Sequence, residues 1–188
     1  IVVVGHKPRG LYVLGSADGI RFTPLSDRPS VTEGAFDSQN LMFWDPVRAE
    51  YREYHRSFSA GVRGIMTAAG KDILNFPPPV WVEFPGAANE HLYTNQVQPY
   101  YRAPHILMGF PMRYNDRGWS ESTLSLPELD ERLARAKSHP RYGTAVTDAL
   151  FMTSRDGQTF KRWPEAFIRP GPAKKDTWTY GDNFVFWG

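Results

Sequence analysis

The sequence predicts an all-β chain, organised as part of a β-propeller. Two observations predict it: one turn motif recurs along the chain, and the strands between its copies come in groups of four. The motif Ser154–Phe160 has the form Ser, any residue, Asp-Gly, two residues, Phe, and Ser16–Phe22 repeats it. A third copy, Gly70–Phe76, keeps the Asp and the Phe. Each copy follows a short apolar run, and Asp-Gly between such runs is a strong hairpin signal because Gly accepts positive φ.

Residues 1–25 predict two strands, the first turn motif and an edge strand, which we interpret as the remnant of a blade. A polar loop with Pro29 follows. Residues 36–84 then supply four strands joined by short turns, a complete blade, with expected strands at 36–44, 51–56, 62–68 and 80–84. Within it, Tyr51–Arg56 alternates as a half-exposed strand does.

The same order starts again, and residues 91–167 predict a second complete blade. Its expected strands lie at 91–97, 104–112, 147–153 and 160–163. A final apolar run within residues 181–188 predicts the first strand of a further blade.

The second blade carries an insertion at residues 115–142, which contains the one short helix that the pattern predicts. Ser125-Leu126-Pro127-Glu128 has the form of a capping box with Pro in the first turn. Leu126, Leu129 and Leu133 form an apolar stripe that runs toward Lys137. We expect a surface helix packed on the sheet edge, and the alternative is an active-site lid.

Four-stranded antiparallel units of this length, each closed by a similar turn, are typical of propeller blades. The alternative all-β fold is a twisted sandwich with hairpins. Recurrence of the turn at one place in each unit favours the propeller. A closed ring needs more blades than residues 1–188 supply, so we expect a fragment of a longer polypeptide, or else a ring completed by another copy. Open blade edges would favour self-association.

The amino-acid composition limits the classes of molecule that the chain is expected to bind. Hydrophobic residues at 41% and charged residues at 22% indicate a globular chain. The 6 Trp, 9 Tyr and 12 Phe are many for this length, and aromatic residues favour strands and also line carbohydrate sites. A net charge of +2 without a basic block gives no sign of nucleic acid as a partner.

The chain has no Cys, which excludes thiolate metal sites and disulfides. His55, His105 and His139 lack the spacing of metal ligands, so we expect no metal and no cofactor. No apolar run reaches the length of a membrane span, so no membrane partner is expected. A cysteine-free composition fits a cytosolic protein as well as the secreted or periplasmic bacterial protein that we expect.

The polar starts of the innermost strands are where a propeller binds its ligands. Asp37, followed by Ser38, Gln39 and Asn40, is the densest polar cluster before an apolar strand. A carboxylate there can act as a general base or anchor sugar hydroxyls, with Asn40 as a further substrate contact. The alternative is an Asx cap at the strand entrance.

Glu90 and His91 precede the next innermost strand. Glu90 is a candidate general acid and His91 a candidate partner of a ligand hydroxyl, and the alternative for both is an exposed loop charge. Asp148, before another apolar run, is a third candidate acid and needs a partner, for which Arg63 is one possibility. Arg63 is also a candidate substrate contact. Asp156 is interpreted as structural, because the same Asp appears in all three copies of the turn.

Further side chains are candidates for contact with the substrate. Trp44 can stack on a sugar ring, although packing between blades is the alternative for most aromatic residues. Arg102 and His105, in a loop rich in hydrogen-bond donors, can contact a carboxylate or a hydroxyl. No Gly-rich phosphate loop and no Gly-x-Ser-x-Gly elbow is present.

The chain resembles the five-bladed propeller glycoside hydrolases, of which the invertase–levanase and arabinanase–xylosidase groups are best known. The resemblance rests on Phe36–Asn40, Phe43–Asp45, Tyr51–Tyr54 and Arg63–Ile65, followed by the Asp-x-x-x-Phe turn. The run from Thr147 to Gly171 resembles bacterial proteins of the same superfamily. The resemblance implies five blades, an axial active site and acidic residues from separate blades, with Asp37 in the place of the early catalytic aspartate.

The Asn-Asp-Pro-Asn-Gly and Arg-Asp-Pro sequences of the invertase group are absent. Asp148 or Glu90 would therefore stand in for the second acid, or that acid lies in a blade outside this chain. We expect a glycoside hydrolase that acts on a poly- or oligosaccharide through paired carboxylates. The alternative is a non-catalytic propeller that binds carbohydrate or a protein partner.

Overall fold

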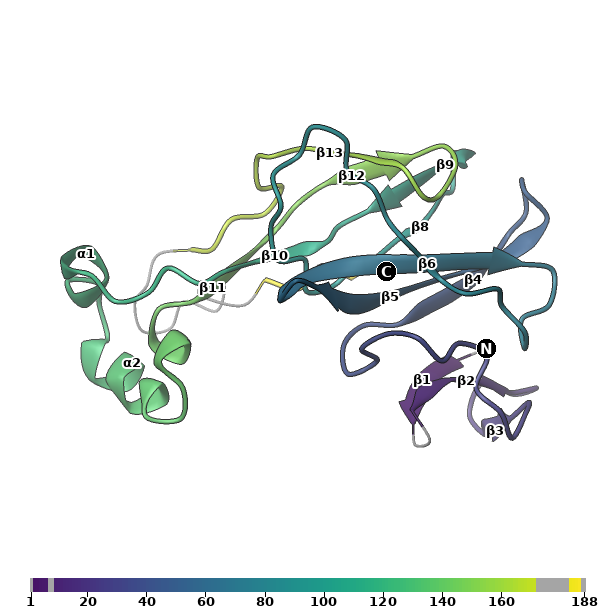
Figure 1. The fold of residues 1–188 in the computed structure, drawn as a ribbon, viewed down its shortest axis with the longest axis horizontal. Helices are drawn as coiled ribbons and strands as arrows, with labels where there is room; N and C mark the ends of the chain where they lie inside the picture. Colours follow the sequence, from purple (N-terminus) through teal and green to yellow (C-terminus); the bar gives the residue numbers. More distant parts are fainter. Residues whose placement is uncertain (1, 7–8, 172–182, 187–188) are drawn as a thin grey trace.

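The computed structural model describes residues 2–6, 9–171 and 183–186, and most of its regular structure is β. The strands form a three-stranded sheet, two four-stranded sheets and a two-stranded ribbon, and none of these closes on itself (Figure 1). The predicted all-β class is confirmed. The helices of the described residues are short, and none of them could span a membrane.

The N-terminal sheet contains β1 (Val2–His6), β2 (Gly10–Gly15) and β3 (Thr23–Pro24) in sequential order. Its predicted turn lies between β2 and β3. The Ser16 and Asp18 side chains accept hydrogen bonds of 2.8–2.9 Å from the backbone N–H groups of residues 19–21, and this holds the turn in shape.

The first four-stranded sheet contains β4 (Leu41–Asp45), β5 (Glu50–Ser59), β6 (Val62–Gly70) and β7 (Val80–Trp81), again in sequential order. The four predicted strands of residues 36–84 are present, but residues 36–40 form a loop rather than the start of a strand.

The centre of β5 differs from its prediction as a half-exposed strand, since residues 52–56 are all buried. Other parts of the chain cover both of its faces. Tyr54 packs into the core shared with the second sheet, and the His55 ring lies 5.1 Å from that of Phe36 on the opposite face.

The second four-stranded sheet contains β8 (Gln98–Tyr100), β9 (Ala103–Gly109), β12 (Met152–Ser154) and β13 (Phe160–Arg162), in the order β13-β12-β9-β8. Its outermost strand on one side is β8, so the predicted strand at 91–97 is wrong. That segment is irregular, with an isolated bridge from Leu92 to Arg113.

The strands predicted at 104–112 and 147–153 both break, and their outer parts form a separate ribbon. This ribbon pairs β10 (Met112–Asn115) with β11 (Val146–Ala149). Proline has no N–H group for a strand ladder, so Pro111 ends the regular pairing of β9. The rings of Phe110 and Phe151, 5.4 Å apart, pack at this bend.

A buried apolar cluster joins the two four-stranded sheets. Beside it, Glu83 accepts a hydrogen bond of 2.9 Å from the backbone of Phe160 and donates one of 2.9 Å to that of Gln158. The fully or nearly fully buried members of the cluster are Tyr54, Ile65, Val82, Leu92, Val97, Leu107, Leu150, Met152 and Phe160. The turn motif of one sheet is therefore bonded to the segment that follows the last strand of the other.

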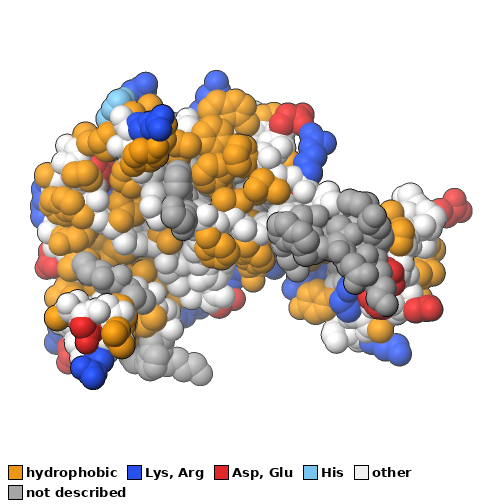
Figure 2. Space-filling view, turned by 180° about the vertical axis from the view of Figure 1, so that it is seen from behind, with side chains coloured by type: hydrophobic (Ala, Val, Ile, Leu, Met, Phe, Trp, Pro, Cys, Tyr) orange, Lys and Arg blue, Asp and Glu red, His pale blue; other side chains and the backbone are white. Residues whose placement is uncertain are grey.

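The insertion forms a helical lobe, residues 116–145, at the far end of the β10–β11 ribbon (Figures 1 and 2). It contains α1 (Glu121–Leu124), α2 (Leu129–Ala136) and a 3₁₀ turn, Pro140–Gly143. The capping box is at Ser120 with Thr123, so the prediction of a box at Ser125 is wrong.

The lobe is built around Arg132 instead of the predicted leucine stripe. Arg132 is fully buried and donates hydrogen bonds to the carbonyl oxygens of Thr123, Leu126 and Pro127, whereas Leu133 is 43% exposed. The lobe stands away from the sheets (Figure 1), so the prediction of a helix packed on the sheet edge is also wrong.

The predicted start of a further blade is only partly described. Residues 183–186 form no strand, and residues 181–182 and 187–188 lie outside the described residues. Asn183 is nevertheless buried, and its side-chain amide donates a hydrogen bond of 3.1 Å to the backbone carbonyl of Thr147 in β11.

Candidate functional site

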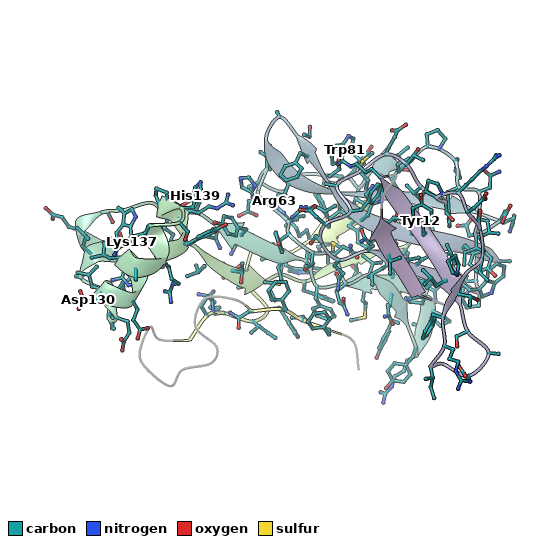
Figure 3. All side chains as sticks on the ribbon, turned by 90° about the horizontal axis from the view of Figure 1, so that it is seen from below. Tyr12, Arg63, Trp81, Asp130, Lys137 and His139 are labelled. Atoms are coloured by element: carbon teal, nitrogen blue, oxygen red, sulfur yellow. The ribbon has the colours of Figure 1, made fainter. Side chains whose placement is uncertain are left out.

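A cleft of about 590 Å³ opens where the main body meets the helical lobe. Figure 3 shows Arg63 at the end of the body nearest this lobe. We call this cleft the arginine cleft. Its polar and aromatic lining comes from the loop before β4, from β5, β6 and β10, from the irregular segment at 91–97, from the lobe and from residues 183–186. It comprises Asp37, Arg56, Phe58, Arg63, Tyr93, Tyr114, Arg135, Arg141, Tyr142 and Phe184.

Local strand geometry explains how β5 and β6 supply part of this lining. The Ala60-Gly61 turn sets the register, which pairs Phe58 directly with Arg63. Side chains two residues apart on a strand share a face, so Arg56 lies beside Phe58. The hairpin register was a signal that could have identified Arg56 from the sequence, and the prediction missed it.

The arginines of the cleft lie against aromatic rings. The guanidinium carbon of Arg56 is 5.0 Å from the Tyr93 ring centroid, and that of Arg63 is 5.1 Å from the Tyr114 centroid. Arg141 lies 5.8 Å from the same Tyr114 ring. These are distances at which a cation is attracted to the face of an aromatic ring. The aromatic side chains therefore hold several cations close together.

That proximity has an electrostatic consequence. Burial lowers the pKa of Arg63, and the neighbouring charges of Arg56 and Arg141 lower it further. Like charges at short range destabilise one another, so an anion entering the cleft would relieve a repulsion that already exists.

Asp37 is the carboxylate that lines the arginine cleft, as the sequence hypothesis required of a ligand-binding acid. Its side chain is 75% exposed and forms an ion pair with Arg56, which is itself 4% exposed. Partial burial raises the pKa of Asp37, but the hydrogen bond and charge of Arg56 outweigh this and leave the pKa below its ordinary value. Asp37 is therefore ionised at neutral pH, and it can accept hydrogen bonds or a proton.

Four polar atoms at this cleft are buried without a hydrogen-bond partner in the protein: Nε of Arg56, Arg63 and Arg141, and the hydroxyl of Tyr114. Burial also raises the pKa of Tyr114, so its hydroxyl stays protonated and can donate. Unpaired buried donors are costly to a protein, and the same state of Nε in Arg52 and Arg162 shows that it is not confined to this cleft.

His91 lies behind Arg63 rather than in the lining. Its Nδ1 accepts a hydrogen bond of 3.2 Å from the backbone N–H of Arg63, and the rings of His91 and Tyr114 are 6.3 Å apart. Burial, followed by the charge of Arg63, lowers the pKa of His91. His91 is thus a neutral group that positions Arg63.

Asp148 and Glu90 come together at another place. Arg113 donates to both carboxylate oxygens of Asp148, at 3.0 and 2.7 Å, and to Glu90 at 2.8 Å. Arg162 donates to the other oxygen of Glu90 at 2.9 Å. Arg113 is therefore the partner of Asp148, and the expectation that Arg63 would fill this role is wrong.

The β10–β11 ribbon separates the lining of the arginine cleft from the group formed by Arg113, Asp148 and Glu90. Side chains alternate along a strand, so Tyr114 and Thr147 line the arginine cleft, while Arg113 and Asp148 line a second cleft with Glu165 and Arg169. Asp37 and Asp148 thus belong to different clefts. The structure unites two of the three candidate acids, Glu90 and Asp148, and leaves Asp37 apart.

The remaining candidates lie outside the lining of both clefts. Asn40 donates to the carbonyl oxygens of Phe36 and Ser38, each at 3.1 Å, and so shapes the loop that carries Asp37. Trp44 packs edge-on against Tyr51, and Arg102 bonds the hydroxyl of Tyr101 at 2.7 Å. His105 is exposed. Within the described part of the chain, no group of three His, Asp or Glu side chains is arranged to hold a metal ion.

No protein-family model matches the sequence, and no curated protein matches it at a significant level. Among solved structures, the chain is similar to an N-acetylgalactosamine deacetylase from F. plautii, determined in complex with blood group B trisaccharide. The TM-score is 0.54 at 13% identity, over 87% of this chain and 46% of the other. The chain spans less than half of that enzyme, and at this identity the likeness is one of fold: this chain shares the fold of part of a carbohydrate-processing enzyme.

Proposed function

We propose that this chain is part of a carbohydrate-active β-propeller and that its saccharide ligand binds in the arginine cleft. The observation that carries the proposal is the lining of that cleft, in which aromatic rings lie beside an ionised carboxylate, Asp37, and beside arginine donors. Saccharides are bound through ring faces and through hydroxyl groups, and this lining offers a partner for each. Similarity in fold to a carbohydrate-processing enzyme supports the same class of ligand.

The propeller itself is proposed from the repetition of sheets. Each of the two four-stranded sheets is a meander whose third and fourth strands are joined by the Asp-containing turn, as in successive blades. The remaining blades of a ring would come from polypeptide beyond these 188 residues or from another copy.

For catalysis, we propose Asp37 as the base or nucleophile. Because its pKa is lowered, Asp37 is unsuited to the role of general acid at neutral pH. Glycoside hydrolysis needs an acid and a base on the two sides of one bond, roughly 5–10 Å apart. Glu90 and Asp148 are already bound by Arg113 at the other side of the ribbon, so the general acid would be neither of these two residues.

One observation favours a second candidate function, a saccharide-binding domain without catalysis. Asp37 is tied to Arg56, and among the described lining residues of the arginine cleft no second carboxylate accompanies it. In this case Asp37 and the arginines would anchor hydroxyl or acidic groups, and no bond of the ligand would break.

The test is to screen the chain against a panel of oligosaccharides by calorimetry and chromatography, with Asp37→Asn as the variant. Glu165→Gln is the control, since this carboxyl is 80% exposed and lies at the other cleft. We expect Asp37→Asn to weaken saccharide binding at least about tenfold, the loss of one charged hydrogen bond, with an unchanged unfolding midpoint. Product formation that Asp37→Asn abolishes would identify an enzyme, and binding without product a binding domain. Equal affinity of Asp37→Asn and the parent chain would contradict the proposed site.

A further inference from the structure

The arginine cleft carries more positive charge than its own carboxylate can neutralise. Four of its lining residues are arginines, at positions 56, 63, 135 and 141, and one is an acid, Asp37. Asp37 pairs with Arg56. Among the described residues, no carboxylate lies within ion-pair distance of the other three arginines, although Asp116 acts on Arg141 from outside the lining.

The second cleft provides the contrast. Its central cation, Arg113, is fully engaged by Asp148 and Glu90, and its exposed Arg169 pairs with Glu165 at 2.6 Å. At the second cleft, Arg113 and Arg169 are therefore neutralised by carboxylates of the chain, and Arg117 donates to the carbonyl oxygen of Thr144. At the arginine cleft, by contrast, Arg63 and Arg141 form no ion pair with a carboxylate of the described residues, and this difference in charge pairing distinguishes the two clefts.

On this basis, which rests on the proposed function, we infer that the ligand of the arginine cleft is an acidic saccharide, whose carboxylate or sulfate group lies between Arg63 and Arg141. The planar guanidinium group presents N–H donors in a fork that matches the oxygen atoms of either anion. The hydroxyl of Tyr114, which lies beside both cations, supplies one more donor.

The aromatic side chains complete the recognition. Tyr93 and Tyr114 hold the guanidinium groups of Arg56 and Arg63 against their ring faces. These side chains therefore have less conformational entropy to lose when a ligand binds. Phe58 and Phe184, 47% and 45% exposed, leave apolar surface at the same cleft for the face of a sugar ring. A neutral saccharide would use the apolar surface but leave the charges of Arg63 and Arg141 without a counterion, and such mismatches weaken binding strongly.

The experiment compares four probes by isothermal titration calorimetry: a neutral galacto-oligosaccharide, an oligogalacturonate and a sulfated galacto-oligosaccharide of equal length, and citrate as a sugar-free anion. The variants are Arg63→Gln, Arg63→Lys and Arg141→Gln. The control is Arg21→Gln, whose side chain is 89% exposed and lies in the N-terminal turn. Near-ultraviolet circular dichroism verifies that each variant is folded.

We expect the parent chain to bind one of the two acidic saccharides at least about tenfold more tightly than the neutral one, with an affinity that falls as salt is added. Arg63→Gln and Arg141→Gln should each lose about ten- to a hundredfold in this affinity. Arg63→Lys keeps the charge but not the forked donors, so its affinity should lie between those of the parent chain and Arg63→Gln. The affinity of Arg21→Gln should match that of the parent chain. The preferred acidic saccharide identifies the anion as carboxylate or sulfate.

Two other outcomes separate this inference from the proposed function. If the neutral saccharide binds as tightly as the acidic ones and Arg63→Gln changes nothing, the acidic ligand is refuted while a saccharide site remains. If citrate binds, depends on Arg63 and is not surpassed by any saccharide, the cleft is an anion site and its assignment to carbohydrate is refuted.

Discussion

The hydroxyl group of Tyr54 donates a hydrogen bond of 2.7 Å to the carbonyl oxygen of Gly157, a residue 103 positions further along the chain. Tyr54 lies at the centre of the first four-stranded sheet, and Gly157 in the turn that joins β12 to β13. The recurring turn motif is thus more than a local connection, because in the second sheet it also anchors one sheet to the next.

A methyl group at Gly157 should disrupt this anchor. Gly157 has φ +85°, and a Cβ there would overlap the guanidinium of Arg52, which Asp45 and Glu50 hold in place. We expect Gly157→Ala to lower the free energy of unfolding by about 2–4 kcal/mol, from backbone strain and overpacking together, in denaturant titrations. Gly19→Ala is the matched control: φ is +72° and no atom lies within 4 Å of its Cβ, so about 1 kcal/mol should be lost. Equal losses would show that Arg52 moves aside freely.

Tyr54 should make the fold sensitive to alkaline pH. Burial raises the pKa of Tyr54 to about 12 from its ordinary value of 10.0. Between these two pH values the unfolded chain releases the proton and the folded chain keeps it, so stability falls as pH rises, by up to about 3 kcal/mol. Tyr54→Phe should cost about 1 kcal/mol at neutral pH and show a flatter decline from pH 10 to 12, measured by urea unfolding. Tyr101→Phe, at a side chain 75% exposed, should leave both the stability and the slope unchanged.

The Arg113 network should contribute to stability. Removing a cation from a largely buried pair leaves charged carboxylates without a partner, so Arg113→Gln should cost about 3 kcal/mol or more. Arg169→Gln breaks an ion pair whose side chains are 70% and 80% exposed, and it should cost less than about 0.5 kcal/mol. Thermal unfolding of both variants tests this. A loss for Arg113→Gln no larger than that for Arg169→Gln would leave Asp148 and Glu90 free for another role.

Arg132 should hold the helical lobe together. Arg132→Met keeps much of the apolar stem but removes donors to three backbone carbonyl groups, at distances of 2.6–3.0 Å. We expect faster amide hydrogen exchange in residues 120–143 and little change in the sheets, together with weaker ligand binding, because Arg141 and Tyr142 line the cleft from this lobe. Leu133→Ala, at an exposed position, should leave exchange in the lobe unaltered. Protection that persists in Arg132→Met would contradict the central role of this arginine.

Features that depend on residues close together in the sequence were predicted well, and features that depend on distant residues were predicted poorly. The turn at Ser154 and Asp156 was predicted correctly because its hydrogen bonds span three residues or fewer. The four strands of residues 36–84 were predicted for the same reason, since they form successive hairpins, whereas the first strand of the second sheet was misplaced. The helix that ends near Lys137 was predicted in the right place, but its packing was not, because its stabilising residue, Arg132, has a long polar side chain that a pattern of leucines does not reveal.

The candidate acids were identified from the sequence as residue types that precede strands, but their partners were not. Asp37 was predicted at a ligand site and lines the arginine cleft, whereas its catalytic role stays a prediction. Arg141 and Tyr114 were missed, because they become part of this cleft only when the ribbon and the lobe come together with β5 and β6.

The sequence by itself determined the all-β class, the recurring turn and the four successive strands of the first four-stranded sheet, because these depend on neighbours along the chain. The tertiary structure decided which charges meet. The bend at Pro111 and the alternation along β10 and β11 send Asp148 to Arg113 on one side of the ribbon. They leave Tyr114 with Arg63 and Arg141 on the other. Charges pair through space, and only the folded chain fixes those separations.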